Sequence, residues 1–512
     1  MKVRSGFAVC AVAACVALPL WAEIKMGAPF SEGAVLQRGM KVPVWGTVSP
    51  DPARTARFVK VEFAGQKKLS AVDAKTGAWK VELDPMQASK TGRSIKVSDM
   101  DKGLLSSKAV ETLEIKDVLV GEVWFASGQS NMECPIWGDR TRYRDGKGGL
   151  MTQMTRLPYV RYVKTPKKWS VERTALAAKW RRFTPEDLQL FHRENLKGGS
   201  PTQLSALAFY YARELYLALD VPVGIIDSSW GGTNIDAWTP RSGYTGCDKS
   251  IQPVADYPVK AKWHPRKHAK WCITRDCQQP TVLFNGMVAD YAPMAMRGFI
   301  WYQGCHNGTE PQLYCAKLHA LYEGWRREFA NPDLKFYLVQ LAPFRTNWMG
   351  ICAAQNKFVA EEKNAAIAVT ADVGNFDDIH PNDKEVVAKR LAVHALKRDY
   401  GFNIAEDDSP VLKSASFKDG KAFLVFDNVK DWYVYAPDYS RAAAFEVAGA
   451  DGVWHAAAIC NYRNKDYVDG ATIILASDKV PAPVKARYMG KNRTFGTMYN
   501  EASLPLGPFE TK

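Results

Sequence analysis

The stretch 117-DVLVGEVWFASGQSNM-132 places a serine, Ser130, directly after a run of apolar and β-prone residues. Valine, leucine, tryptophan and phenylalanine follow one another without the 3.6-residue period of a helix, so residues 117–128 are predicted to form a buried strand. A serine at the end of such a strand fits two interpretations. It is either a nucleophile held where a strand meets a loop, or an ordinary turn or cap residue.

Helices and strands alternate on the carboxyl side of this stretch. The apolar residues of 203–219 recur at helical spacing, and 222–232 then has the pattern of a buried strand that ends in glycines. This alternation continues and predicts a parallel α/β sheet flanked by helices. The further helix–strand elements are expected at 288–304, at 312–330 with 335–344, and at 366–374 with 383–401.

Segments rich in β-pattern lie on both sides of this region. Short alternating runs such as 57-RFVKVEFAG-65 predict a small β-sandwich before it. After it, Asp-Gly pairs such as 419–420 separate further strands. The predicted division is an N-terminal β-sandwich domain (23–116), a catalytic α/β domain (117–404) and a C-terminal β-rich domain (405–512).

The first 22 residues have the composition of a secretory signal peptide. Lys2 and Arg4 precede an apolar run that ends in Ala22. A lipoprotein signal with Cys15 as the modified residue is the alternative, but the apolar run continues past that cysteine. The protein is therefore expected to be secreted or periplasmic, and no later stretch is long enough to cross a membrane.

The charge pattern bears on the possible partners. The 512 residues carry a formal net charge of +14, spread along the chain and not concentrated in a tail. Basic proteins attract nucleic acid, but they also attract acidic sugars and envelope surfaces. Because no nucleic-acid motif is present, no nucleic-acid partner is expected, and a glycan or small-molecule substrate is favoured.

Polar residues follow the predicted parallel strands at the edge where open α/β sheets bind ligands. Together these loops supply a serine, a glycine pair, an asparagine and a histidine, in that order, which is the set of groups that acyl transfer needs. The four loops are 127-SGQSNM-132, 227-DSSWGGTNIDAW-238, 301-WYQGCHN-307 and 372-DVGNFDDIHP-381.

In this interpretation Ser130 attacks a carbonyl carbon after His380 takes its proton. A carboxylate then holds the imidazole in the right tautomer, and both Asp377 and Asp378 lie close enough in sequence to do so. The chemistry requires no metal and no organic cofactor, and none is expected.

The negative charge of the tetrahedral intermediate needs hydrogen-bond donors. The candidates are the backbone N–H of Ser130, the backbone N–H of Gly231 or Gly232, and the side chain of Asn307. The glycine pair also fits a tight turn, and the two roles are compatible.

The order Ser, Gly, Asn, His resembles the SGNH hydrolase superfamily, and the longer motifs resemble the sialate O-acetylesterase family. These motifs are GQSNM (128–132), SSWGGT (228–233), PTVLFNGM (280–287), WYQG (301–304), QLAPF (340–344) and IHP (379–381). Similarity extends to 34-AVLQRGMKVPVWG-46 and 499-YNEASLPLGPFET-511, so it covers nearly the whole chain after the leader.

The resemblance implies an SGNH-type fold for the central sheet and specific roles for the site residues. Asp377 is the implied acid of the triad, since a DxxH spacing is usual in the superfamily. Several members instead orient the histidine with backbone carbonyls, so a Ser-His pair without a triad acid is the alternative. The implied oxyanion and substrate-binding residues are Gly232, Asn307, Gln129 and Gln303.

Two cysteines depart from the family pattern. The family usually has WYQGESN, and here Cys305 and His306 replace the Glu-Ser pair; Cys134 likewise stands where methionine is common. Because the serine and asparagine loops are neighbours in the superfamily, a Cys134–Cys305 disulfide is expected. Two small buried thiols are the alternative.

The stretch 263-WHPRKHAKWCITRDC-277 offers a second motif. His264, His268, Cys272 and Cys277 have ligand-like spacing for zinc. A basic surface loop with a Cys272–Cys277 disulfide or with unpaired thiols is favoured over zinc, because the export signal favours a disulfide. No metal site is therefore predicted.

The sequence thus predicts a carbohydrate O-acetylesterase, and the resemblance implies 9-O-acetylated sialic acid as its substrate. An esterase acting on acetylated xylan or another glycan is the alternative within enzymes. A non-catalytic glycan-binding protein on an esterase scaffold is the alternative of another class, and the intact Ser130, Asn307 and His380 argue against it.

Overall fold

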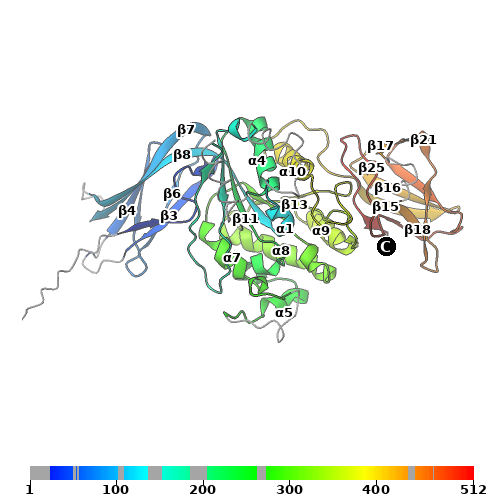
Figure 1. The fold of residues 1–512 in the computed structure, drawn as a ribbon, viewed down its shortest axis with the longest axis horizontal. Coiled ribbons are helices and arrows are strands. Elements are labelled where there is room, and N and C mark those ends of the chain that lie inside the picture. Colours follow the sequence, from blue (N-terminus) through cyan, green and yellow to red (C-terminus); the bar gives the residue numbers. More distant parts are fainter. Residues whose placement is uncertain are drawn as a thin grey trace, which may run out of the picture.

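The structure is a computed structural model in which three parts lie in a row: a β-sandwich, an α/β part and a β-rich part that holds the C-terminus (Figure 1). None of the helices within its described residues is long and apolar enough to span a membrane. The structure describes residues 23–49, 54, 57–101, 109–136, 153–184, 204–261, 273–346, 348–435, 444–464 and 466–511.

The central sheet is parallel, as predicted. Its strand order is β10-β9-β11-β8-β12-β13-β14, and every neighbouring pair runs in parallel except β9 and β10. All side chains of β11 and β12 are buried, as expected for a sheet covered on both faces. The strands are β8 Ala109–Gly128, β9 Val160–Lys164, β10 Arg181–Arg182, β11 Val223–Ser229, β12 Gly298–Tyr302, β13 Lys335–Val339 and β14 Ala365–Ala368.

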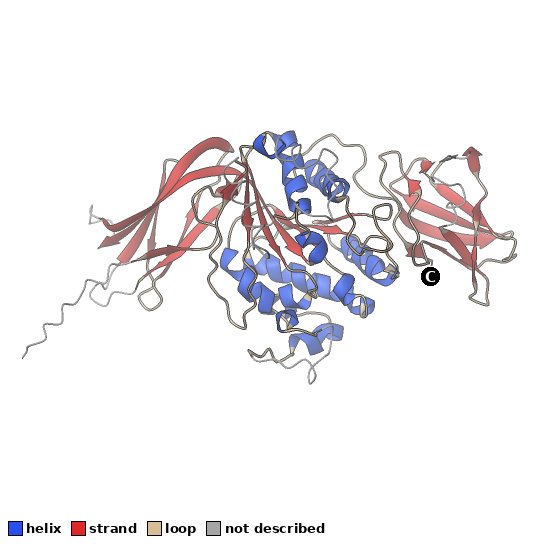
Figure 2. Ribbon diagram, in the orientation of Figure 1, coloured by secondary structure: helices blue, strands red, loops and turns tan. Residues whose placement is uncertain are grey.

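Helices cover both faces of this sheet, α4 and α10 on one side and α7, α8 and α9 on the other (Figure 2). The helix expected within 288–304 does not form. Instead α7 ends at Met287 and a short turn follows, because Pro293 has no backbone donor and cannot continue a helix. The helices are α1 Ser130–Glu133, α4 Ala206–Leu219, α5 Gln252–Ala255, α7 Val282–Met287, α8 Pro311–Glu328, α9 Met349–Glu361 and α10 Lys384–Arg398.

The N-terminal sandwich pairs the sheet β1-β3-β6 with the strands β5, β4, β7 and β8. Strand β8 runs from the sandwich into the central sheet, so the boundary expected between residues 116 and 117 falls inside a strand. One hydrophobic core spans both parts. The other strands are β1 Ile24–Met26, β2 Val35–Gln37, β3 Val42–Val48, β4 Arg57–Phe63, β5 Gln66–Ala71, β6 Ala78–Leu83 and β7 Ser89–Asp101.

The C-terminal part is β-rich, as predicted, and has a core of its own that includes Trp432 and Phe445. The Asp-Gly pair between β15 and β16 has both residues at positive φ (Asp419 +50°, Gly420 +72°), which suits a tight hairpin turn. The strands are β15 Val411–Lys418, β16 Lys421–Asp427, β17 Trp432–Val434, β18 Phe445–Ala448, β19 Trp454–Ala456, β20 Ala458–Ile459, β21 Tyr462–Asn464, β22 Tyr467–Val468, β23 Thr472–Ala476, β24 Lys485–Tyr488, β25 Met498–Tyr499 and β26 Phe509–Glu510.

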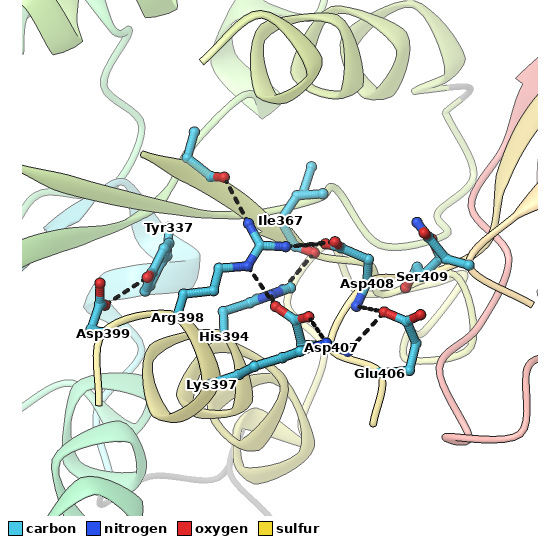
Figure 3. A network of polar contacts seen from close by, with 12 residues as sticks. Tyr337, Ile367, His394, Lys397, Arg398, Asp399, Glu406, Asp407, Asp408 and Ser409 are labelled. Carbon is cyan, nitrogen blue, oxygen red and sulfur yellow. Dashed lines mark hydrogen bonds and ion pairs between the residues drawn. The ribbon is translucent and has the colours of Figure 1, made fainter. Parts of the chain in front are cut away.

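A polar network fastens α10 to the segment that leads into β15 (Figure 3). Asp407 accepts a hydrogen bond from Arg398 Nε at 2.5 Å and lies 3.1 Å from His394 Nδ1, while Arg398 also donates to both oxygens of Asp408 at 2.6 Å. Burial raises the pKa of Asp407, but hydrogen bonds from His394, Lys397 and Arg398 outweigh it and hold that pKa well below its usual range. These charges are therefore satisfied within the protein.

Candidate active site

Ser130 lies where β8 ends and α1 begins, at the carboxyl edge of the central sheet. The turn before it requires glycine, since Gly128 has a φ of +141° and a Cβ there would lie 2.3 Å from the carbonyl oxygen of Tyr302. The backbone N–H of Gln129 donates to that same oxygen at 3.0 Å. The serine turn is thus held against the end of β12.

The structure joins Ser130 and His380, which are 250 positions apart in the sequence. Ser130 Oγ lies 2.9 Å from His380 Nε2, and His380 Nδ1 lies 2.9 Å from Asp378 Oδ1. The histidine and aspartate side chains are 13% and 33% exposed. A serine, an imidazole and a carboxylate bonded in series form the arrangement that makes a serine hydroxyl nucleophilic.

Asp378, and not the expected Asp377, is the carboxylate beside His380. Asp378 Oδ1 also accepts the backbone N–H of His380 at 3.0 Å, which is the two-residue turn that aspartate side chains commonly form. Asp377 is 79% exposed and pairs with Arg493 Nη2 at 2.8 Å. The spacing of Asp377 from His380 therefore does not decide which carboxylate contacts the imidazole. The local turn places Asp378 there, and the Asp377 side chain points toward Arg493 of the C-terminal part.

Asn131 and Lys384 tie the serine turn to the histidine loop, a link that sequence reasoning missed. Asn131 Nδ2 donates to the carbonyl oxygen of Ile379 at 3.0 Å, and Lys384 Nζ donates to Asn131 Oδ1 at 2.6 Å. Burial lowers the pKa of Lys384 to about 8. Nothing in the sequence marks this lysine, because the first residue of a helix is ordinarily exposed.

The glycine loop after β11 packs against the serine. A Cβ on Gly231 would lie 3.2 Å from the Cβ of Ser130. The N–H of Gly231 donates to Glu133 Oε2 at 2.6 Å, and the other oxygen of Glu133 pairs with Lys167. Since the N–H of Gly231 donates to Glu133, the N–H of Gly232 is the remaining candidate oxyanion donor of the two glycines considered from the sequence.

Two side chains from a later segment of the chain, Arg275 and Gln278, hold the backbone of Gly232 in place. Its φ is +68°, and its carbonyl oxygen accepts hydrogen bonds from Arg275 Nη2 at 2.5 Å and Gln278 Nε2 at 2.6 Å. Arg275 is exposed. The loop beside the serine therefore presents a guanidinium group to solvent.

Asn307 is fully buried, and its orientation is fixed by three contacts. Its Oδ1 accepts hydrogen bonds from Gln303 Nε2 at 2.8 Å and from the backbone N–H of Ile235 at 3.1 Å. Its Nδ2 donates to Glu310 Oε1 at 2.6 Å. Because an amide has two N–H groups, this arrangement uses one of them in the Glu310 contact.

A cluster of buried charges contacts Asn307 through Glu310. Lys317 Nζ lies 2.5 Å from Glu310 Oε1 and 2.7 Å from Asp236 Oδ2, and the three side chains are at most 8% exposed. Burial raises the pKa of Asp236, which the nearby lysine opposes. Sequence reasoning missed this cluster, because charged residues on helices and loops are usually solvated.

Gln129 and Gln303 hold loops together, and the substrate-binding role expected for them stays a prediction. Gln129 Oε1 accepts the backbone N–H groups of Gly304 at 3.2 Å and His306 at 3.3 Å. Gln303 Nε2 is shared between Asn307 and a backbone carbonyl just after the glycine pair. Both side chains are buried, so their amides act inside the scaffold.

The expected Cys134–Cys305 disulfide is not formed; both residues are thiols. Cys134 is tied through its backbone to Ser130 and to Ala206 at the start of α4, whereas Cys305 opens the short turn that ends at Asn307. Burial raises the pKa of Cys305 to about 12, so this thiol is protonated at neutral pH.

Two expectations lie outside the described residues. The zinc and disulfide hypotheses for 263–277 depend on His264, His268 and Cys272, and the structure describes only the end of that stretch, where Cys277 is a buried thiol. The predicted signal peptide, residues 1–22 with Cys15, is likewise not described.

The parallel sheet and the Ser-His-Asp chain at its carboxyl edge define the class, a hydrolase with an SGNH-like α/β fold. Residues 120–397 match the family described as carbohydrate esterase, sialic acid-specific acetylesterase, and the chain belongs to this family. It is accordingly a carboxylic ester hydrolase.

The chain is similar to proteins of known name. The sialate O-acetylesterase of Homo sapiens is 29% identical over 416 residues, covering 75% of this chain and 74% of the human one. That of Mus musculus is 27% identical over 395 residues, covering 70% of each. A crystal structure of a carbohydrate acetylesterase from Xanthomonas citri superimposes with a TM-score of 0.75 at 31% identity, covering 96% of this chain and all of that one.

Proposed function

We propose that this protein is a carbohydrate O-acetylesterase in which Ser130 is the nucleophile, His380 the general base and acid, and Asp378 the carboxylate that orients the imidazole. The observation that carries the proposal is the continuous chain of 2.9 Å contacts from Ser130 Oγ through the two ring nitrogens of His380 to Asp378 Oδ1. Removing any of the three groups breaks this chain.

The reaction proceeds in two halves. His380 Nε2 takes the proton of Ser130 Oγ as that oxygen bonds to the acetyl carbon. The intermediate collapses when Nε2 protonates the sugar oxygen, which leaves as an alcohol and an acetyl-serine remains. His380 Nε2 then takes a proton from a water molecule as that water attacks the acetyl carbon, and gives it to Ser130 Oγ, which leaves as acetate is released. The backbone N–H groups of Ser130 and Gly232 and the second N–H of Asn307 stabilise the oxyanion.

The substrate within this class is proposed to be an O-acetylated sialic acid. Sialic acids carry a carboxylate, and Arg275 is an exposed residue whose guanidinium contacts Gly232, next to the Gly231 that packs against Ser130. Arginine recognises carboxylates through paired N–H groups. A neutral acetylated glycan such as xylan has no carboxylate to bind this guanidinium. The contact would therefore distinguish the two candidate substrates.

Acetate release tests the proposal. The wild-type chain should release acetate from 9-O-acetylated sialic acid faster than from acetylated xylan, and Arg275→Met, which also removes the contact with Gly232, should raise KM for the sialic acid more than for xylan. Faster turnover of xylan by the wild type would favour the alternative substrate. Absence of activity on both substrates and on p-nitrophenyl acetate would favour the non-catalytic glycan-binding protein.

The protein is further proposed to be exported through residues 1–22, whose basic and apolar segments fit a cleaved leader. Fractionation of cells that express the full chain tests this proposal, together with the N-terminal sequence of the product. A mature chain that begins at Glu23 outside the cytoplasm is expected. A chain retained in the cytoplasm with Met1 intact would contradict it, and a chain that begins at Cys15 would indicate the lipoprotein alternative.

A further inference from the structure

A second cluster of reactive side chains lies between α8 and α9, away from Ser130. Cys315 and His319 are four residues apart on α8 and therefore lie on the same face of that helix. Glu361, the last residue of α9, faces them. Its Oε2 lies 3.7 Å from Cys315 Sγ and 2.9 Å from His319 Nε2, and the three candidate ligand atoms lie within 4.8 Å of one another.

The histidine is oriented by a further carboxylate. His319 Nδ1 lies 2.9 Å from Glu362 Oε1, so its Nε2 is the nitrogen that faces Cys315 and Glu361. Histidines that bind metal ions usually donate their second ring N–H to such a carboxylate, which fixes both the tautomer and the direction of the ring. The contacts of His319 thus match those of a metal ligand on both sides of the ring.

The cluster opens into a pocket of about 530 Å³. Cys315, His319 and Glu361 line it, together with Cys247 and Asp248. A hydrated ion therefore has access to the three side chains, and water can complete the coordination of an ion that they bind.

An ordinary ion pair between two helices explains part of this geometry. His319 lies between Glu361 and Glu362, and Lys357 Nζ lies 3.8 Å from Glu361 Oε1. The thiol adds a third donor atom to this ion pair. Cys315 is buried, and its S–H donates to Glu361 Oε2 at 3.7 Å, whereas Lys357 lies beside Oε1.

We propose that Cys315 Sγ, His319 Nε2 and Glu361 Oε2 bind a divalent cation of the zinc class, with water as the fourth ligand. A thiolate, an imidazole and a carboxylate are the donors that Zn²⁺ takes in tetrahedral sites, whereas Mg²⁺ and Ca²⁺ prefer oxygen ligands alone. Binding displaces the proton of the thiol, since only the thiolate ligates, and no electron is transferred.

The ion would join the end of α9 to the middle of α8. Lys317, which holds the buried charges behind Asn307, lies on the same helix between the two ligands. Its ligands are distinct from Ser130, His380 and Asp378, so the proposed site is structural: it stabilises the helix pair and takes no part in acyl transfer. Chelation of the ion should lower the Tm of the chain while the esterase reaction still proceeds without added metal.

Cobalt substitution tests the ligand set, because Co²⁺ occupies zinc sites and gives a thiolate charge-transfer band when a cysteine ligates it. The full chain should bind about one Co²⁺ with this band, and Zn²⁺ should displace it. Cys315→Ser should abolish the band. The matched control Cys460→Ser, at an exposed thiol of the C-terminal part, should keep it.

Three results would overturn the proposal: no band in the wild-type chain, a band that survives Cys315→Ser, or a band lost in Cys460→Ser. Thermal unfolding of the wild-type chain gives an independent readout that needs no variant to fold. Saturating Zn²⁺ should raise its Tm and Mg²⁺ should not, and an equal response to both ions would contradict a zinc-class site. His319→Gln, which retains side-chain polarity, should lose the Zn²⁺-dependent part of the increase.

Discussion

The asparagine loop and the histidine loop are built differently. On one side, Asn307 is fully buried and its orientation is fixed by hydrogen bonds backed by Glu310, Lys317 and Asp236, all of them shielded from solvent. On the other side, His380 is half-buried, and the loop that carries it is reached by Arg493 from the C-terminal part.

The difference follows from what each side must do. Donors for an oxyanion act best when they are fixed before the reaction and shielded from water. The base must exchange protons with both a sugar alcohol and a water molecule, so it needs access to solvent. The rings of Phe376 and Phe495 stack with their centroids 4.2 Å apart, and this contact stabilises the histidine loop against the C-terminal part.

The largest effect on kcat is expected for Asp378, the carboxylate beside His380. Asp378→Asn should lower kcat by about 10²- to 10⁴-fold, because the amide no longer stabilises the imidazolium or fixes its tautomer. Asp377→Asn is the matched control and should cost less than about tenfold, since it removes only an exposed ion pair. Steady-state kinetics on one acetyl ester compares them. A damaging Asp377→Asn beside a silent Asp378→Asn would reverse the assignment.

On the buried side, Lys317→Met should destabilise the fold by about 3–5 kcal/mol, because it leaves two buried carboxylates without their partner. Urea unfolding measures this loss of free energy. The control is Lys413→Met, whose ion pair with Asp427 is 60% and 53% exposed and should contribute less than about 1 kcal/mol. Equal losses in the two variants would show that the cluster behind Asn307 is not specially stabilising.

Lys384 predicts a pH dependence of stability. Its pKa is about 8 in the folded chain against an ordinary value of 10.5, so between these pH values the unfolded chain binds more protons. The contribution of this group to the free energy of unfolding therefore rises with pH across that window, by up to about 3 kcal/mol.

Urea unfolding at pH 7.5 and 10 tests this dependence by comparing the wild type with Lys384→Met, which cannot titrate. The stability of the wild type relative to the variant should increase at the higher pH. Lys389→Met, at an exposed lysine of the same helix, controls for the general effect of removing a charge. A difference between wild type and Lys384→Met that stays constant with pH would contradict the burial of an ionisable amine.

The smallest effect is expected for the link to the C-terminal part. Arg493→Ala removes the ion pair with Asp377, whose two side chains are 55% and 79% exposed, and should change stability by less than about 1 kcal/mol. Its kcat should stay within about tenfold of the wild type. Arg463→Ala, at another exposed pair of the same part, is the control for stability. A larger loss of kcat would mean that the histidine loop depends on this contact.

The positions of Ser130 and His380 could be predicted because a parallel sheet brings the ends of its strands to one edge. The choice between Asp377 and Asp378 could not, since a single turn decides which of two adjacent carboxylates faces the imidazole. The burial of Lys317 and Lys384 could not be predicted for another reason. Their helical segments are amphipathic, and only tertiary packing places these charges inside. The exact boundary near residue 116 stays a prediction, because β8 runs without a break from the sandwich into the central sheet.

The nucleophile is the central claim, and covalent labelling tests it most directly. A fluorophosphonate probe should react with one residue of the folded chain, and peptide mass spectrometry should place the label on Ser130. His380→Ala should slow the labelling strongly, because the serine loses its base. A label on another residue, or full esterase activity in a chain whose Ser130 is quantitatively labelled, would contradict the account.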